Sequence, residues 1–271
     1  SSGYHISVKG GRFMEAIANA DTVVFDKTGT LTYATPTVAK VVSFDGYSAS
    51  EMLRLAACLE EHYPHSIANA VVAEAKRLGL DHKEYHSQVE YVVAHGISST
   101  VEDKKVIIGS AHFVFEDEGC VVPEAEQEKF NTLPEEYSHL YLCIAGRLAA
   151  VICISDPLRK EAKDAIQVLH ACGISKVVMM TGDSRRTAEA VAREVGVDQF
   201  YAEVLPEDKA NFVRQEKAAG RKVIMIGDGV NDTPALSEAD VGIAINTGAA
   251  IAREIADVTI ASEDLFELVT L

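Results

Sequence analysis

The sequence predicts an α/β protein built on a parallel β-sheet, with a second domain of α+β character inserted into it. Short apolar runs rich in Val, Ile and Met alternate with helical patterns, and several of these runs end at Gly or Asp. Strands that are apolar on both faces are typical of a parallel sheet covered by helices on both sides. A length of 271 residues also suits two domains better than one.

The strands and helices of the parallel sheet domain can be placed from these patterns. Its expected strands lie within 22–26, 176–183, 222–229, 241–245 and 258–261. Helices are expected where apolar residues recur three and four positions apart and where the pattern closes on a glycine. These helices lie at 159–173, 185–196 and 207–220.

The segment 35–151 follows a different pattern and is expected to form the inserted domain. Its helical and alternating stretches lie at 49–79, 91–110 and 140–154. Residues 1–34 and 152–271 are then expected to form the first domain. The chain re-enters it through the sequence "ISDPLRKEA", in which Pro157 favours an extended junction before a new helix.

Composition narrows the class of protein. A formal net charge of −16 argues against a nucleic-acid partner, because phosphate backbones are bound by clustered Lys and Arg. Five scattered cysteines without a CxxC pair indicate a reducing compartment rather than a disulfide scaffold. No apolar run approaches the roughly 18 residues of a membrane span, and the first residues lack the apolar core of a signal peptide. We therefore expect a soluble cytoplasmic piece.

Polar residues follow three of the expected strands at the point where each strand ends. Asp26 ends the first run, Thr181 follows the second and Asp228 follows the third. In parallel sheets, ligands bind outside the carboxyl ends of the strands. We therefore expect these three side chains to meet at one edge of the sheet.

Phosphoryl transfer to a carboxylate is the chemistry that these residues favour. A carboxylate at the tip of a buried strand can attack phosphorus and become an aspartyl phosphate, which makes Asp26 the expected nucleophile. Such a reaction requires a divalent cation and donors for the other phosphate oxygens. Lys209 is expected to supply the ammonium group and Thr181 a hydroxyl group. Gly182 is expected to supply a backbone amide.

The remaining acidic and amide residues are expected to hold the metal and the phosphate. Asp228, in the sequence "GDGVND", is the expected ligand of Mg²⁺. Asn231 and Asp232 are expected to orient the phosphate and the metal. Asp183, which completes the sequence "TGD", is placed in the same supporting group.

The combination of "DKTGTLT", "TGD" and "GDGVNDTPAL" resembles the P-type cation-transporting ATPases, within the haloacid-dehalogenase-like phosphotransferases. The resemblance covers essentially the whole chain. It implies a Rossmann-like domain in which Asp26 is transiently phosphorylated by ATP with Mg²⁺. It also implies partner domains on the same full-length chain, namely transmembrane helices that carry the cation and an actuator domain. This piece would then be the cytoplasmic portion of an integral protein of the cell membrane.

Thr28 distinguishes the hypothesis of a P-type pump from that of a soluble phosphatase of the same fold. Such phosphatases carry an Asp-x-Asp motif at this place, and its second carboxylate transfers protons and then activates water. A threonine cannot do this near neutral pH, so we expect slow hydrolysis of the phosphorylated Asp26. The resemblance further implies that the main-chain carbonyl of Thr28 binds Mg²⁺ together with Asp26 and Asp228.

The resemblance also implies that the insert binds nucleotide, and its small size resembles the heavy-metal branch. In that branch a Glu and a His five residues later bind adenosine, and Glu60 and His65 stand at these places. Ser66 stands where a proline is expected. His65 could instead be an ordinary hydrogen-bonded histidine.

Two glycines complete the expected nucleotide site. A Gly-x-Gly loop is expected from the resemblance, and here it reads Ala94-His95-Gly96. The Gly-Asn pair that usually follows appears as Gly109-Ser110. Gly96 and Gly109 are therefore expected to let the nucleotide approach the backbone, although either could be a simple turn glycine.

Other interpretations remain open. The pairs His62 with His65 and His82 with His86 have helical spacing that suits Zn²⁺ or Cu²⁺, but no Cys or carboxylate completes either set. A potassium-pumping P-type ATPase also has a compact insert. A soluble phosphatase and a non-catalytic binding module are the alternatives from other classes. In the leading hypothesis, the junctions near Thr35 and Asp156 act as a hinge.

Overall fold

The computed structural model describes residues 6–8, 11–63, 65–80, 90–92, 96–228, 232–245 and 254–260. The chain divides into two compact units. The first, termed the discontinuous unit, comprises Ser1–Ala34 and Pro157–Leu271, and the second, termed the inserted unit, comprises Thr35–Asp156. The inserted unit ends at Asp156 rather than at the expected Val151, because its strand β8 (Arg147–Ser155) continues to Ser155.

The discontinuous unit contains the expected parallel sheet, which has seven strands in the order β1-β13-β12-β11-β2-β9-β10. All neighbouring pairs are parallel except β1 with β13. The predicted α/β class is thereby confirmed. The strands are β1 (Ile6–Val8), β2 (Thr22–Asp26), β9 (Lys176–Met180), β10 (Gln199–Tyr201), β11 (Val223–Gly227), β12 (Val241–Ile245) and β13 (Val258–Ile260).

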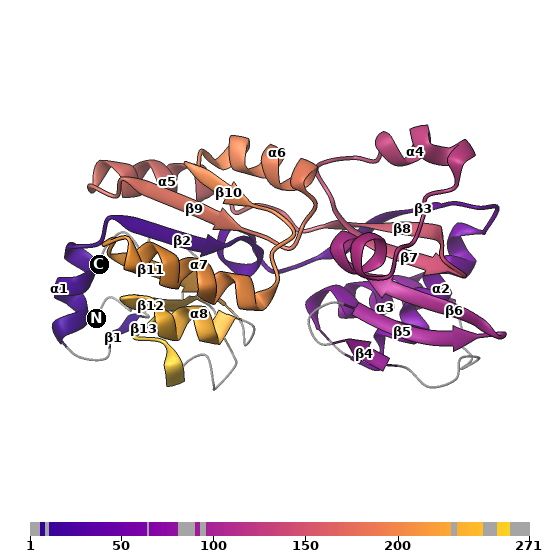
Figure 1. The fold of residues 1–271 in the computed structure, drawn as a ribbon, viewed down its shortest axis with the longest axis horizontal. Helices are drawn as coiled ribbons and strands as arrows, with labels where there is room; N and C mark the ends of the chain where they lie inside the picture. The colour runs from indigo at the N-terminus through magenta and orange to yellow at the C-terminus, as the bar shows by residue number, and fades with distance from the viewer. Residues whose placement is uncertain are drawn as a thin grey trace. The chain divides into compact units, whose positions relative to one another are not determined.

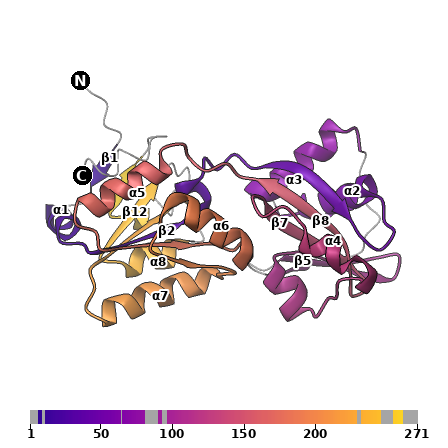
Figure 2. The ribbon, with the colours of Figure 1, turned by 90° about the horizontal axis from the view of Figure 1, so that it is seen from above.

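Helices cover both faces of this sheet (Figures 1 and 2). Because successive strand residues point to opposite faces, Val23 and Phe25 of β2 pack on one side and Val24 on the other. The first side is covered by α1 (Gly11–Ala18), α5 (Ala162–Ala171) and α6 (Arg185–Val195). The second is covered by α7 (Pro206–Ala218) and α8 (Thr233–Glu238).

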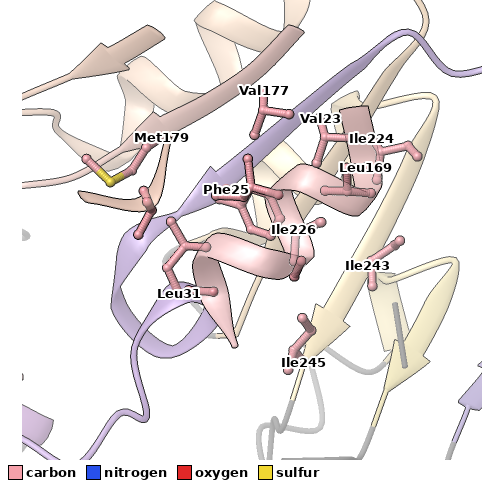
Figure 3. Packing of buried hydrophobic residues seen from close by; sticks show 14 of the residues in the cluster. Val23, Phe25, Leu31, Leu169, Val177, Met179, Ile224, Ile226, Ile243 and Ile245 are labelled. Atoms are coloured by element: carbon pink, nitrogen blue, oxygen red, sulfur yellow. The ribbon is translucent and has the colours of Figure 1, made fainter. Parts of the chain in front are cut away.

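The core on the first side anchors the strand that carries Asp26. Val23 and Phe25 are at most 1% exposed. They form one apolar cluster with Leu169 of α5 and Ile226 of β11 (Figure 3). Leu31, which follows Asp26 in the sequence, belongs to the same cluster. The carboxyl end of β2 is therefore held by apolar contacts before and after Asp26.

The helices begin and end where the sequence places the signals. Helix α6 starts after Ser184, whose hydroxyl oxygen accepts a hydrogen bond from Thr187 N at 3.4 Å. It ends at Gly196, whose φ of +83° is the left-handed conformation that favours glycine. Helix α7 has Pro206 in its first turn, and the Asp208 carboxylate accepts a hydrogen bond from Leu205 N at 2.9 Å.

The inserted unit is an antiparallel sheet of six strands in the order β3-β8-β7-β6-β5-β4. Its elements are β3 (Thr37–Ser43), α2 (Ala49–Glu60), α3 (Ser66–Arg77), β4 (Glu90–Val92), β5 (Gly96–Val101), β6 (Lys104–Gly109), α4 (Gln127–Asn131), β7 (Ser138–Ile144) and β8. Helices α2 and α3 pack on one face of the sheet. Among the helices that the structure describes, none is both long enough and apolar enough to cross a bilayer.

Candidate active site

The pairing of three parallel strands sets the position of Asp26. Asp26 is the last residue of β2 and lies beside Met180 of β9, so Thr181 follows directly at the same edge. On the other side, Phe25 lies beside Ile226 of β11, so Asp228 follows two residues later. The expectation that Asp26, Thr181 and Asp228 gather at one edge of the sheet agrees with this register.

Three carboxylates come together at this edge. Oxygen atoms of Asp26, Asp228 and Asp232 all lie within 4.8 Å of one another. Within the described parts of the chain, this is the group of three or more metal-ligating side chains that the geometry brings together. Carboxylate oxygens are the ligands that Mg²⁺ prefers, and so close a cluster of like charges is stabilised by a divalent cation. The donor set therefore fits Mg²⁺.

Two glycines allow these carboxylates to approach the backbone. A Cβ atom built on Gly29 would lie 1.5 Å from Asp228 Oδ2, and the φ of Gly29 is +81°. A Cβ atom built on Gly227 would lie 2.6 Å from Asp232 Oδ2. Both contacts are shorter than any that a side chain tolerates, so each position requires glycine for the cluster to form.

Lys209 supplies positive charge to the cluster. Its side chain extends from α7 and is 9% exposed, with Nζ 3.2 Å from Asp26 Oδ2 and 2.9 Å from Asp232 Oδ1. Burial disfavours its charge, but the carboxylates of Asp26 and Asp232 outweigh this effect and raise the pKa of Lys209. The lysine therefore stays protonated at neutral pH.

Asp26 responds to the same surroundings in the opposite way. Burial raises its pKa well above the usual range, and the negative charge of Asp232 raises it further, while Lys209 lowers it. Asp228 adds a smaller effect that also raises the pKa. The Asp26 carboxylate thus lacks enough positive charge around it, which is the deficit that a bound divalent cation would remove.

The turn that follows Asp26, η1 (Lys27–Leu31), is held by its own threonines. The hydroxyl group of Thr30 donates to the carbonyl oxygen of Asp26, and Gly29 N donates to Thr32 Oγ1 at 2.9 Å. Thr28 departs from helical geometry, with φ −70° and ψ 124°. The polar run "DKTGTLT" therefore satisfies part of its backbone groups locally while it turns away from a buried strand.

Arg159 holds the same turn from outside, a contact that motif reading did not identify. It is 3% exposed, its Nε donates to Thr30 O at 2.8 Å and its backbone N donates to Leu31 O at 2.8 Å. The only sequence signal is a charged residue at the first position of the helix predicted over 159–173. Its buried partner cannot be read from spacing.

The "TGD" loop contributes Thr181, Gly182 and Asp183. Thr181 is 2% exposed, and its Oγ1 accepts a hydrogen bond from Asp183 N at 3.1 Å. Gly182 is exposed at the loop. The Asp183 carboxylate forms an ion pair with Lys27, which sequence reasoning did not include in the site. Asn231, the remaining predicted supporting residue, lies outside the described residues.

In the inserted unit, Glu60 and His65 lie next to each other across the connection between α2 and α3. Glu60, at the end of α2, is 3% exposed, and its Oε2 lies 3.2 Å from His65 Nε2. His65 precedes α3, and its Nδ1 accepts a hydrogen bond from Ala68 N at 3.3 Å. Because Nδ1 is an acceptor, the neutral ring carries its proton on Nε2.

Ser66 and the two glycines also have defined places. Ser66 is the first residue of α3, a position where proline is favoured, and His65 before it is extended. Gly96 and Gly109 lie opposite each other on β5 and β6. A Cβ atom on Gly96 would lie 2.4 Å from Ile108 O, so packing alone already requires glycine there. Ala94 and His95 lie outside the described residues.

The histidine pairs do not form a metal centre in the described residues. His62 is exposed, and His65 is used as a helix cap and as the neighbour of Glu60. His82 and His86 lie outside the part of the chain that the structure describes. The acidic cluster around Asp26 is thus the better metal site.

Comparison with known proteins identifies the family. Residues 20–240 match the model of the haloacid dehalogenase-like hydrolases. The chain is 42% identical over 260 residues to copper-transporting ATPase 2 of Rhizobium meliloti (strain 1021), an alignment that covers 94% of this chain and 30% of that protein.

Solved structures give the same result. The catalytic domain of the CPx-ATPase CopB-B matches with a TM-score of 0.78 and 30% identity, covering 98% of this chain and 94% of that one. A zinc-transporting PIB-type ATPase in the E2.Pi state matches with a TM-score of 0.60 and 34% identity, covering 98% of this chain and 42% of that one.

The chain belongs to the haloacid dehalogenase-like hydrolases and, within them, to the catalytic domains of heavy-metal P-type ATPases. The family predicted from "DKTGTLT" and its companion motifs is confirmed, and heavy-metal relatives favour it over a potassium pump or a soluble phosphatase. The chain spans 30 to 33% of the length of the curated relatives it matches.

Proposed function

We propose that this chain is the ATP-binding and phosphorylation unit of a membrane pump for heavy-metal cations, in which Asp26 becomes an aspartyl phosphate. The observation that carries this proposal is the contact of Lys209 with both Asp26 and Asp232, inside a cluster of three carboxylates. A nucleophile, a cation and a set of oxygen ligands for Mg²⁺ are the parts that phosphoryl transfer to a carboxylate requires.

In the proposed reaction, an Asp26 carboxylate oxygen attacks the γ-phosphorus of ATP, and the bond to the β-phosphate oxygen breaks to release ADP. Lys209 offsets the repulsion between the carboxylate and the incoming phosphate. Asp228 and the main-chain carbonyl of Thr28 would hold Mg²⁺ with Asp26, and Asp232 would orient this group. The metal would neutralise charge on the transferred phosphoryl group.

The loop after β9 would bind the remaining phosphate oxygens. The Thr181 hydroxyl and the Gly182 backbone amide are the donors that we assign to this role, because strand pairing brings them to the same edge as Asp26. Thr28 replaces the second carboxylate that would activate water in a phosphatase, so the aspartyl phosphate should persist. In the full-length protein, the actuator domain would then promote hydrolysis.

The inserted unit is the proposed adenosine site. Glu60 Oε2 is buried and accepts no hydrogen bond from any described residue, although His65 Nε2 lies 3.2 Å away. A buried carboxylate oxygen of this kind is costly unless a donor reaches it, and the exocyclic amine of adenine is such a donor. We further assign Gly96 and Gly109 to the approach of the nucleotide.

The function of the whole protein follows from its relatives as a proposal. The relatives and neighbours are described as transporting copper or zinc. We infer that this unit acts on the cytoplasmic side of a membrane, where it drives transmembrane segments of the same chain that bind the heavy-metal cation.

Incubation with γ-labelled ATP and Mg²⁺ tests the proposal. We expect an acid-stable, hydroxylamine-sensitive phosphoprotein in the wild type and none in Asp26→Asn, because the amide is not a nucleophile. Asp164→Asn, at an exposed position of α5, is the control and should be labelled normally. Rapid, Asp26-dependent turnover of a chromogenic phosphate ester without a stable phosphoprotein would instead identify a phosphatase.

A further inference from the structure

Lys27 is a buried lysine directly after the nucleophile, and the function proposed above does not use it. Its side chain is 4% exposed, and its ammonium group pairs with Asp183 Oδ2. The Asp183 side chain is 13% exposed. A charge so well removed from water is costly unless it is paired, so this ion pair is part of the local structure.

The ion pair joins the two loops that carry the phosphoryl-transfer groups. Lys27 begins the turn after β2, and Asp183 belongs to the loop after β9. Asp183 N donates to Thr181 Oγ1 at 3.1 Å, and Asp183 O accepts a hydrogen bond from Glu203 N at 2.8 Å. Fixing Asp183 therefore also fixes Thr181 and Gly182 relative to Asp26.

The charges divide into two groups at this edge of the sheet. Lys209 lies between Asp26 and Asp232, within the cluster of carboxylates that fits Mg²⁺. Asp183 is not a member of that cluster, and its carboxylate faces Lys27 instead. Lys27 thus neutralises a carboxylate that would otherwise repel an approaching phosphate.

We propose that Lys27 and Asp183 form a positioning pair, which aligns the "TGD" loop with Asp26 and keeps the Asp183 charge away from the phosphate and the metal. The inference rests on the proposed function and changes the expected role of Asp183 from support of the phosphate and Mg²⁺ to a structural partner of Lys27. It makes Lys27 a positioning residue rather than a catalytic one.

A double-mutant cycle with Lys27→Met, Asp183→Asn and the double variant tests the pair. The rate of aspartyl phosphate formation should fall on the order of 100-fold in Lys27→Met, because a misplaced loop faces an unpaired carboxylate. The double variant should regain much of that loss, since it removes the unpaired charge. If the double variant is as slow as Lys27→Met, Lys27 contacts the phosphate directly and the proposal is overturned.

Magnesium dependence separates the pair from a metal-ligand role. In Asp183→Asn, the Mg²⁺ concentration for half-maximal phosphorylation should stay unchanged while the rate falls. A rise of about tenfold or more would identify Asp183 as a metal ligand and overturn the proposal. Lys27→Arg keeps the charge and should retain most of the rate of phosphorylation. It takes the place of Lys27→Met in the test if Lys27→Met does not fold.

A matched control and a second measurement complete the test. Lys176→Met removes another poorly exposed lysine of β9, whose Nζ lies 2.7 Å from Glu216 Oε1, and should lower stability without slowing phosphorylation. Urea unfolding of the Lys27 and Asp183 variants without nucleotide should show non-additive losses. Additive losses would show that Lys27 and Asp183 do not act as a pair, and they would overturn the proposal even if labelling succeeds. A wild type that is not labelled would instead count against the proposed function alone.

Discussion

Asp26 lies in surroundings that favour its neutral form, although its proposed reaction requires the carboxylate. Burial and the charge of Asp232 raise its pKa, and the nearby ammonium of Lys209 only partly offsets them. The site is therefore strained electrostatically before any cation binds. Bound Mg²⁺ would lower the pKa of Asp26 and so favour the carboxylate form that the proposed reaction requires.

The raised pKa of Asp26 predicts a pH dependence of stability. A carboxyl group whose pKa is higher in the folded than in the unfolded protein contributes stability at low pH, and this is lost as pH rises through the folded-state value. Without Mg²⁺, Asp26→Asn should therefore be more stable than wild type at neutral pH. The difference should shrink toward pH ~4, where the unfolded carboxyl group is itself protonated.

Urea unfolding at several pH values, with and without Mg²⁺, measures this effect. Addition of Mg²⁺ should stabilise the wild type more than Asp26→Asn, because the variant has lost a ligand. A wild type that is more stable than the variant at neutral pH without metal would contradict the raised pKa.

Gly29 predicts a loss of function that a matched glycine does not share. Gly29→Ala and Gly46→Ala both place an alanine at positive φ, +81° and +78°, and each should cost about 1–2 kcal/mol of stability. Only Gly29→Ala also drives a methyl group into Asp228, whereas Gly46 has no atom within 4 Å of its Cβ position.

We therefore expect Gly29→Ala to abolish labelling by γ-labelled ATP and Gly46→Ala to keep it. Unfolding curves recorded alongside show whether the two variants share the backbone cost. Equal labelling of both variants would mean that Asp228 moves aside freely and that the cluster is not built as described.

At the scale of elements, the sequence predicted five of the seven strands of the parallel sheet because their residues are largely apolar and buried, whereas the short strands β1 and β10 were not predicted. β2 was placed at residues 22–26, and the structure gives Thr22–Asp26. Partners that depend on side-chain direction could not be predicted, because spacing does not determine them. Lys27 with Asp183, and Arg159 with the Thr30 carbonyl, are joined across 156 and 129 residues of sequence.

The departure at Ser66 gives a prediction about α3. Position 66 begins the helix, where a backbone N–H has no partner within the helix, and His65 is already extended with φ −153° and ψ 176°. Ser66→Pro should therefore fit without strain and stabilise the inserted unit by roughly 0.4–1 kcal/mol, because it restricts the unfolded chain.

Calorimetric unfolding and nucleotide titration check this prediction, with Ser66→Ala as the control that leaves the backbone free. Restricting the chain at His65 should keep or strengthen ATP binding in the proline variant. A proline variant that is less stable than the alanine variant would show that the N–H of residue 66 has a partner in the folded protein.

At the scale of the whole molecule, the insertion leaves both units with adjacent ends. In the inserted unit, Thr37 pairs with Ser155 across β3 and β8. In the discontinuous unit, Thr32 bridges to Leu158 and Tyr33 N donates to Pro157 O at 3.1 Å. Units whose ends meet in this way tolerate separation, because closing the gap costs little chain entropy.

We therefore expect residues 35–156 to fold alone and to bind ATP, and residues 1–34 joined to 157–271 by a short Gly-Ser linker to fold with the Mg²⁺ cluster intact. The isolated inserted unit should lose about tenfold in ATP affinity on Glu60→Gln, because the amide presents a weaker acceptor to adenine.

The joined discontinuous unit should accept a phosphoryl group from acetyl phosphate but be labelled by ATP only at high concentration. Labelling by ATP as efficient as in the complete chain would show that the nucleotide is bound without the inserted unit.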